Sequence, residues 1–147
     1  MLFTPAETKV VVVGGGTMDA DVAAVCARGG CAVQVVEPTT ERRALLPDYF
    51  VNTMTELGYE NRIHLLTVAG TLEEVDWSDI DLVIECVPER LDIKRELFAK
   101  LERYAKPEAV LASNSTSFPI SEIAEGLKTP ARMIGLHFFM PAHLIPC

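Results

Sequence analysis

The sequence predicts an α/β fold with a doubly wound, mostly parallel sheet and helices on both of its faces. Short β-branched runs alternate along the chain with longer stretches of helical periodicity. This alternation indicates parallel strands joined by right-handed crossovers. Several of the short runs are apolar at nearly every position, as strands are when helices cover both faces of a parallel sheet.

The elements follow one another in a regular order. The first strand, "KVVVV", leads through a glycine turn into the helical stretch "TMDADVAAVCARGG", and the second strand is "CAVQVVE". The third helix ends before Pro107, and its apolar face carries Leu91, Leu97, Phe98 and Leu101. We expect six strands, at residues 9–13, 32–36, 63–68, 82–87, 109–112 and 133–137, and four helices, at residues 18–28, 40–57, 91–105 and 120–127.

Size and charge restrict the function. The 147 residues fit one domain, residues 1–147, and a domain of this size buries roughly 70% of the surface of its unfolded chain. The net charge of -8 argues against nucleic acid or an anionic membrane as partner. No apolar run approaches the roughly 18 residues of a membrane span, and the N-terminus lacks the features of a secretory signal. The four cysteines form no metal-ligand grouping, so we expect no metal, reduced thiols and a cytoplasmic location.

The glycine turn predicts a nucleotide site. Gly14 and Gly16 stand between the first strand and the first helix, where free N–H groups at the helix N-terminus can bind a pyrophosphate. Gly14 would permit the tight turn, and Gly16 would let the phosphates approach the backbone, as in the Rossmann fold. Thr17 and Met18 follow as the first helical residues and complete the candidate cofactor site.

Glu37 predicts which dinucleotide would bind. It closes the second strand, 23 residues after Gly14, and an acidic residue at about this distance accepts the ribose diol of NAD. A carboxylate there would repel the 2′-phosphate of NADP. Arg42 and Arg43 lie further along the chain and could soften that preference, so NADP remains a variant of the prediction.

Asp19 departs from this pattern, because it stands where the fingerprint has a third glycine. Its bulk and charge would lie near the phosphates, although an acidic residue in a first helical turn favours the helix dipole. Two interpretations follow: a working site of reduced affinity, which we favour, or a fold that has kept its shape and lost its ligand.

Three further strand ends carry polar side chains. Glu85, Glu89 and Lys94 follow the fourth strand, residues 113–117 ("SNSTS") follow the fifth, and His137 ends the sixth. Since parallel strands present their carboxyl ends at one edge, these groups should converge there. Taken singly, the hydroxyl cluster before Pro119 could be turn chemistry, and the histidine could be a core residue.

The motifs "GGGTM", "IECVPERLDIKRELFAKLE", "LASNSTSFPISEIA" and "GLHFFMP", in this order, cover nearly the whole chain. Together they resemble the NAD-binding domain of the 3-hydroxyacyl-CoA dehydrogenase family, and "ECVPE" also resembles its L-gulonate 3-dehydrogenase and lambda-crystallin branch. The resemblance implies NAD as cofactor and hydride transfer from the 3-hydroxyl of a 3-hydroxyacyl-CoA. The segment 38–62 is short beside the helical hairpin that helps to hold CoA, which favours a smaller 3-hydroxy acid to some extent.

The resemblance also implies roles for matching residues. His137 matches the catalytic base, and an imidazole suits proton transfer near neutral pH. Thr116 stands where the family commonly has a serine that bonds the substrate oxygen, with Asn114 in the matching "SN" motif. Glu89 and Lys94 match residues near the nicotinamide and its ribose.

Two departures bear on activity. Met140 replaces an asparagine of the family, and the glutamate that orients the histidine would lie beyond Cys147. The family's helical C-terminal domain, which supplies much of the substrate pocket and the dimer contact, is absent from the 147 residues, so the chain is expected to be either a fragment or a stand-alone relative, and it could form a homo-oligomer. We therefore expect weak or no turnover by this chain alone. The alternative function is a non-catalytic dinucleotide-binding or structural relative with an impaired cofactor site.

Overall fold

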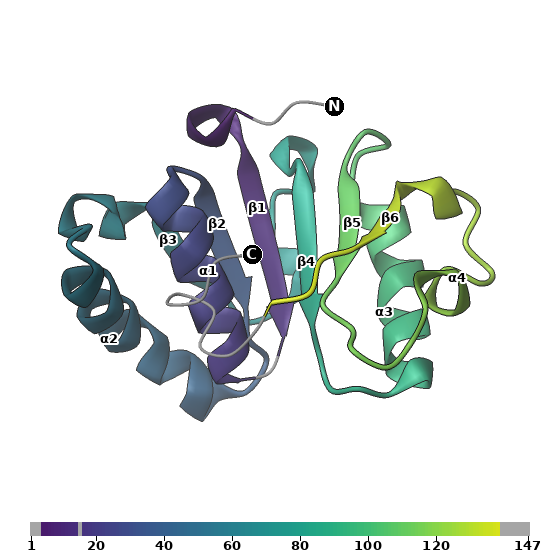
Figure 1. The fold of residues 1–147 in the computed structure, drawn as a ribbon, viewed down its shortest axis with the longest axis horizontal. Helices are drawn as coiled ribbons and strands as arrows, with labels where there is room; N and C mark the ends of the chain where they lie inside the picture. Colours follow the sequence, from purple (N-terminus) through teal and green to yellow (C-terminus); the bar gives the residue numbers. More distant parts are fainter. Residues whose placement is uncertain (1–3, 15, 139–147) are drawn as a thin grey trace.

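The computed structural model describes residues 4–14 and 16–138. Its centre is a six-stranded sheet in which every neighbouring pair of strands is parallel, which confirms the predicted doubly wound fold (Figure 1). The strand order is β3-β2-β1-β4-β5-β6. The strands are β1 (Lys9–Gly14), β2 (Ala32–Val36), β3 (Leu66–Ala69), β4 (Leu82–Cys86), β5 (Val110–Ser113) and β6 (Met133–Gly135).

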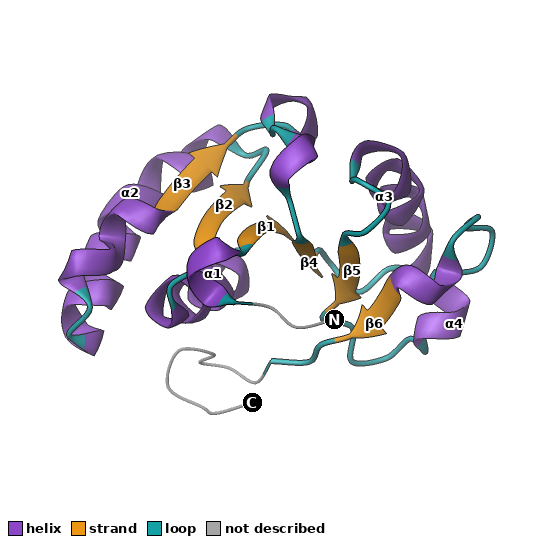
Figure 2. Ribbon diagram, turned by 90° about the horizontal axis from the view of Figure 1, so that it is seen from above, coloured by secondary structure: helices purple, strands orange, loops and turns teal. Residues whose placement is uncertain are grey.

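Helices cover the sheet on both faces. The four α-helices are α1 (Thr17–Gly29), α2 (Thr40–Leu57), α3 (Leu91–Tyr104) and α4 (Ile120–Ile123). Seen along the edge of the sheet, α1 and α3 lie on opposite faces (Figure 2). The order of the strands reverses between β1 and β4, and in sheets of this kind ligands bind beside that reversal, at the carboxyl ends of the strands.

The alternating side chains of β1 divide the interior into two cores. Val10 and Val12 pack with α1 and with the large apolar residues of α2, whereas Val11 and Val13 pack with α3 and α4 on the other face. Because a strand turns successive side chains to opposite faces, a strand with helices on both sides must be apolar throughout. This explains the unbroken valine run in the sequence.

Three elements have a boundary that differs by more than one residue from the predicted one. Residues Glu60–Leu65 form a 3-10 helix, so β3 begins at Leu66, where its register with β2 begins. The last helix ends at Ile123, after which the Leu127 N–H bonds to the Ala124 carbonyl only three residues back. The final strand ends at Gly135 because β5, its one partner among the described strands, ends at Ser113.

Within residues 4–14 and 16–138, no helix combines the length and the apolar character needed to cross a bilayer.

Candidate cofactor and substrate site

The predicted site residues meet at the carboxyl edge of the central strands. Gly14, which ends β1, lies in register with Cys86, which ends β4. Glu85 of β4 is in register with Ser113 of β5. The polar side chains that follow these strands therefore share one edge of the sheet, and they form two clusters there.

The first cluster is the glycine turn. Gly16 adopts a φ of +144°, a backbone conformation that favours glycine, and α1 begins one residue later. Gly14 is required for a different reason: a Cβ at this position would lie 2.6 Å from Cγ of Asp19. The Asp19 carboxyl group is thus folded back onto the end of β1. Its Oδ2 accepts a hydrogen bond from the Gly16 N–H at 3.3 Å, an amide that the sequence predicted for a phosphate.

Asp19 is buried and incompletely bonded. Its residue surface is only 2% exposed, and Oδ1 has no hydrogen-bond partner among the described residues. Burial is the main cause that raises the pKa of Asp19 to about 7; its own N–H and that of Gly16 oppose the rise, and the charge of Glu37 adds to it.

Glu37 lies beside Asp19 in a similar state. It is 2% exposed, and its Oε1 accepts the Thr39 N–H at 3.2 Å and pairs with Arg42 Nε at 3.1 Å. Its Oε2 has no partner in the described part of the chain. Arg43 turns away from both carboxyl groups and bonds the carbonyl of Glu37 at 2.9 Å.

A pocket of about 170 Å³ opens between these groups. It is lined by Gly16, Thr17, Asp19, Ala20, Glu37, Arg42, Leu45, Leu46 and Tyr49. The sequence analysis did not assign the last three residues, which come from α2. The residue pattern gave no signal for them, and the 69% exposure of Leu45 is seen only in the structure. Met18 was predicted to bind cofactor, but it packs against the core and is not among the lining residues.

The pocket fits the ribose end of a dinucleotide. Glu37 Oε2 is a buried acceptor that has no donor among the described residues, and a ribose hydroxyl would supply one. The apolar side chains of Leu45 and Leu46 offer a surface for a base. At the glycine turn, where the pyrophosphate of the dinucleotide would lie, the Gly16 N–H donates its hydrogen bond to Asp19.

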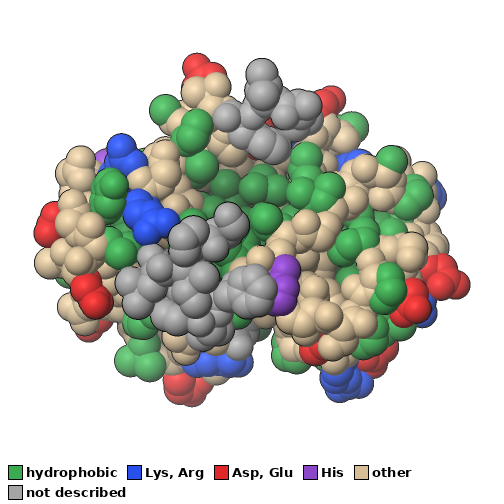
Figure 3. Space-filling model, in the orientation of Figure 1, with side chains coloured by type: hydrophobic (Ala, Val, Ile, Leu, Met, Phe, Trp, Pro, Cys, Tyr) green, Lys and Arg blue, Asp and Glu red, His purple; other side chains and the backbone are tan. Residues whose placement is uncertain are grey.

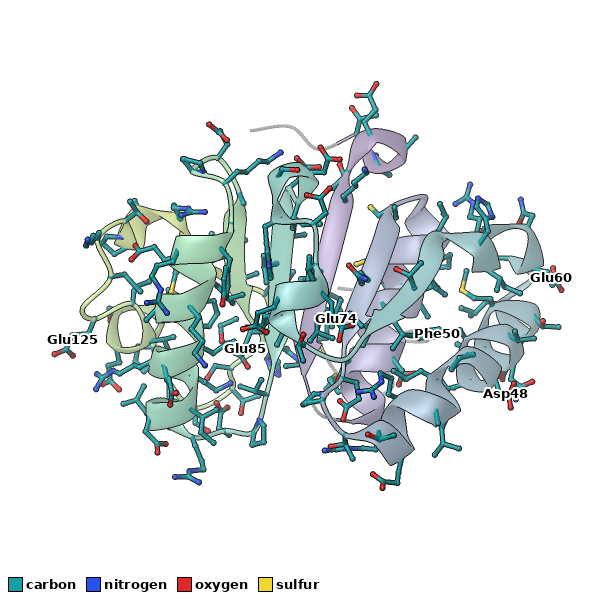
Figure 4. All side chains as sticks on the ribbon, turned by 180° about the vertical axis from the view of Figure 1, so that it is seen from behind. Asp48, Phe50, Glu60, Glu74, Glu85 and Glu125 are labelled. Atoms are coloured by element: carbon teal, nitrogen blue, oxygen red, sulfur yellow. The ribbon has the colours of Figure 1, made fainter. Side chains whose placement is uncertain are left out.

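The second cluster is centred on a buried lysine. Lys94 of α3 is 1% exposed, and Glu85 is fully buried. Lys94 Nζ lies 2.7 Å from Glu85 Oε2 and 3.3 Å from Glu89 Oε1. The hydroxyl of Ser113 donates to Glu85 Oε1 at 2.5 Å, and the Val87 N–H donates to Glu85 Oε2 at 2.8 Å. Figure 4 shows Glu85 among the side chains between α3 and the central strands.

Glu89 connects this cluster to the hydroxyl-rich loop. Its carboxylate accepts the Ser115 hydroxyl at 2.8 Å, the Thr116 N–H at 2.8 Å and hydroxyl at 2.9 Å, and the Ser117 N–H at 3.1 Å. Burial favours the neutral acid, but these hydrogen bonds outweigh it and, with Lys94, lower the pKa of Glu89 to about 2. Thr116 is therefore hydrogen-bonded to a Glu89 carboxylate that stays ionised at neutral pH.

Asn114 acts on the backbone beside His137. Its N–H donates to the Glu85 carbonyl at 2.9 Å, and its Oδ1 accepts the Phe138 N–H at 2.7 Å. Since Leu136 also donates to the Ser113 carbonyl, the backbone on both sides of His137 is tied to the end of β5. The imidazole of His137 is exposed at this edge. Met140 and Cys147 lie outside the described residues.

This edge, with its glycine turn, buried acidic residue and reversal of strand order, defines a dinucleotide-binding α/β domain. Residues 9–147 match the family model described as 3-hydroxyacyl-CoA dehydrogenase, NAD binding domain. The chain belongs to the 3-hydroxyacyl-CoA dehydrogenase family and forms its NAD-binding domain.

Three relatives illustrate the match. A 3-hydroxybutyryl-CoA dehydrogenase of Mycobacterium tuberculosis (strain CDC 1551 / Oshkosh) is 40% identical over 98% of this chain and 53% of its own length. A glyoxysomal fatty acid beta-oxidation multifunctional protein of Cucumis sativus is 33% identical over 94% of this chain and 20% of its own. The crystal structure of 3-hydroxybutyryl-CoA dehydrogenase from Escherichia coli superposes with a TM-score of 0.82 at 33% identity, over 92% of this chain and 30% of that one. The chain thus spans about half the length of the mycobacterial relative.

Proposed function

We propose that the chain is the cofactor-binding half of an NAD-dependent oxidoreductase that acts on the 3-hydroxyl of a 3-hydroxyacyl-CoA. The observation that carries this proposal is the convergence of two clusters at one sheet edge: the pocket at Glu37, and the anchored Thr116 loop beside His137. The named activity of the mycobacterial relative, a 3-hydroxybutyryl-CoA dehydrogenase, supports it. A smaller 3-hydroxy acid is the alternative substrate.

In this proposal, different residues bind the cofactor, accept the substrate proton and position the catalytic groups. Gly14, Gly16, Thr17 and Glu37 hold the adenosine diphosphate part of NAD, and NAD supplies the hydride acceptor. His137 takes the proton from the substrate hydroxyl. The Thr116 hydroxyl donates to Glu89 in this structure, and it would turn from Glu89 to donate to the substrate oxygen, because the single proton of the substrate hydroxyl goes to His137. Asn114 positions the backbone of His137, and Lys94 holds Glu89 in place.

The test is a titration of the chain with NADH and with NADPH, followed by nicotinamide fluorescence. We expect saturable NADH binding and at least tenfold weaker NADPH binding, because Glu37 would face the 2′-phosphate. Turnover by these 147 residues should be weak, because the chain supplies only about half the length of the mycobacterial relative. Steady-state rates of roughly 10 s⁻¹, the median for enzymes, would overturn that expectation.

One observation favours a second candidate, a non-catalytic relative that has lost its ligand. The Asp19 carboxyl group packs against Gly14 and accepts the hydrogen bond of the Gly16 N–H, which a phosphate would otherwise accept. If neither NADH nor NADPH binds at any pH, this candidate replaces the first.

Location and assembly are part of the same proposal. A cytoplasmic location is supported by Cys31 and Cys86, which form no disulfide among the described residues, as is usual in a reducing compartment. The name of the cucumber relative instead suggests an organelle of glyoxysomal type, and a fluorescent fusion in the source cell distinguishes the two. Homo-oligomer formation is proposed from the family resemblance, and sedimentation of the chain tests it.

A further inference from the structure

Asp19 and Glu37 present two buried carboxyl groups to one pocket, and each has an oxygen without a partner among the described residues. Their surroundings differ. Arg42 lies 3.1 Å from Glu37 Oε1 and balances its charge. Asp19 accepts a 3.3 Å hydrogen bond from Gly16 and interacts with its own N–H, and no cation lies at salt-bridge distance from it in the described structure.

The other titratable groups around Asp19 do not provide that cation. Glu37 faces it from the end of β2 and Cys86 from the end of β4, and both interact with its charge unfavourably. On α2, Arg42 is the one favourable charge. Tyr49 of the same helix lines the pocket, but its hydroxyl donates to Asp21, two residues further along α1. An ionised Asp19 is therefore poorly compensated.

A dinucleotide would make this imbalance worse. Its pyrophosphate carries two negative charges, and it needs the amides at the start of α1, one of which Asp19 already holds. Like charges at close range in a buried site favour protonation of one of them. A protonated carboxyl group has lost its charge and gained an O–H donor, so it can bond a phosphate oxygen instead of repelling it.

We infer that this domain binds its dinucleotide together with one proton, which is taken up by the Asp19 carboxyl group. Asp19 is then a determinant of cofactor affinity that couples binding to pH. The inference rests on the proposed function, because it needs NAD to be the ligand. The pKa of about 7 in the free protein places the transition near neutrality. Above that pH each unit should weaken binding tenfold, since only the protonated fraction binds.

The main experiment compares three proteins from pH 6 to pH 9 by NADH fluorescence. For the wild type we expect the Kd to rise about 100-fold over this range. Asp19→Asn keeps the shape without the charge, and its Kd should change less than about threefold. Asp48→Asn is the matched control: Asp48 is exposed on α2 and points away from the sheet (Figure 4), so this variant should follow the wild type.

A second measurement needs only the wild type. Calorimetric titration with NADH at pH 8, in two buffers of different ionisation enthalpy, counts the protons taken up. We expect close to one proton per NADH.

The outcomes separate the inference from the proposed function. Wild-type binding that is independent of pH, without proton uptake, overturns the inference and leaves NAD binding intact. A pH dependence that persists in Asp19→Asn assigns the proton to another group, such as His137, and also overturns it. Absence of NADH binding by all three proteins at every pH overturns both.

Discussion

Asp19 and Gly14 constrain each other. The carboxyl group of Asp19 occupies the volume that any side chain at Gly14 would need. The sequence could predict that Gly14 and Gly16 form a turn, because glycines between a strand and a helix have few other uses. It could not predict where the Asp19 side chain goes, since a first-turn carboxylate can equally point into solvent. That position depends on the packing of α1 against β1.

The burial of Asp19 predicts a pH-dependent stability. Its pKa rises from 3.8 unfolded to about 7 folded, so between these values the native state holds a proton that the unfolded state has released. The free energy of unfolding therefore falls as pH rises through this window, by about 4 kcal/mol in total. In Asp19→Asn this decline is absent. Urea unfolding of both proteins from pH 4 to pH 8 checks it, and parallel curves would contradict it.

For Glu37, the sequence predicts the role of the residue but not the partner of its side chain. Its distance from Gly14 predicted its role, because the second strand and the turn meet at one edge. Its pairing with Arg42 could not be predicted over the neighbouring Arg43. The two arginines face different directions from the first turn of α2: Arg42 pairs with the carboxylate, whereas Arg43 bonds backbone carbonyls.

Among the elements, β4 and α3 are joined by the buried pair of Glu85 and Lys94. Lys94→Met would leave Glu85 buried without its cation, and we expect a loss of about 3–5 kcal/mol in the free energy of unfolding. The double variant Glu85→Gln/Lys94→Met should be less destabilised than the single one, because no charge is then left unpaired. Urea unfolding measures both.

The control for this prediction lies on the same helix. Lys100 is exposed and lies 4.0 Å from Glu96, so Lys100→Met should cost less than about 1 kcal/mol. Equal losses at Lys94 and Lys100 would show that the buried pair has no special role.

The loop after β5 depends on Glu89. Glu89→Gln removes the anion that accepts the Thr116 and Ser117 amides, and each hydrogen bond to a charged group contributes about 1.5–3 kcal/mol. We expect amide hydrogen exchange at these two residues to accelerate about tenfold or more, measured by NMR. Glu125→Gln, which breaks only an exposed pair with Arg95, should leave both rates unchanged. The pKa of about 2 implies that this anchor persists in mild acid and is lost only as the pH falls toward that value.

The bounds of the long helices and of the buried strands β1, β2, β4 and β5 were predictable to within one residue, whereas those of β3, α4 and β6 were not. The helix at 40–57 matches its predicted bounds, because its length and periodicity suffice to define it. The bounds of β3, α4 and β6 depend on partners that are distant in sequence. For example, β6 can extend only as far as β5 offers backbone groups.

At the scale of the whole molecule, the surface charge of the protein does not help the proposed cofactor site to attract its ligand. Figure 3 shows acidic side chains around the rim of one face and apolar side chains toward its middle. With a net charge of -8, long-range attraction will not bring an anionic cofactor to the protein. Binding then depends on the local amides and on the pocket at Glu37, and added salt should not weaken it, because salt screens the long-range repulsion between the protein and the cofactor.

Cofactor binding should stabilise the whole domain. NADH at 100 times its Kd adds about 2.7 kcal/mol to the free energy of unfolding, which raises the Tm of a domain of this size by about 5–10 °C. NADPH at the same concentration should give a much smaller shift. Differential scanning fluorimetry near pH 6.5 measures both, and equal shifts would show that Glu37 does not select between them.

Glu85 has a consequence for how the domain unfolds. Its carboxylate is neutralised and hydrogen-bonded only when β4, β5 and α3 are all in place, through Val87, Ser113 and Lys94. A partly unfolded form that releases α3 leaves Glu85 without its cation, and one that releases β5 leaves Glu85 without the hydrogen bond from Ser113. Such intermediates are therefore too costly to accumulate, and this half of the sheet should melt in a single all-or-none step.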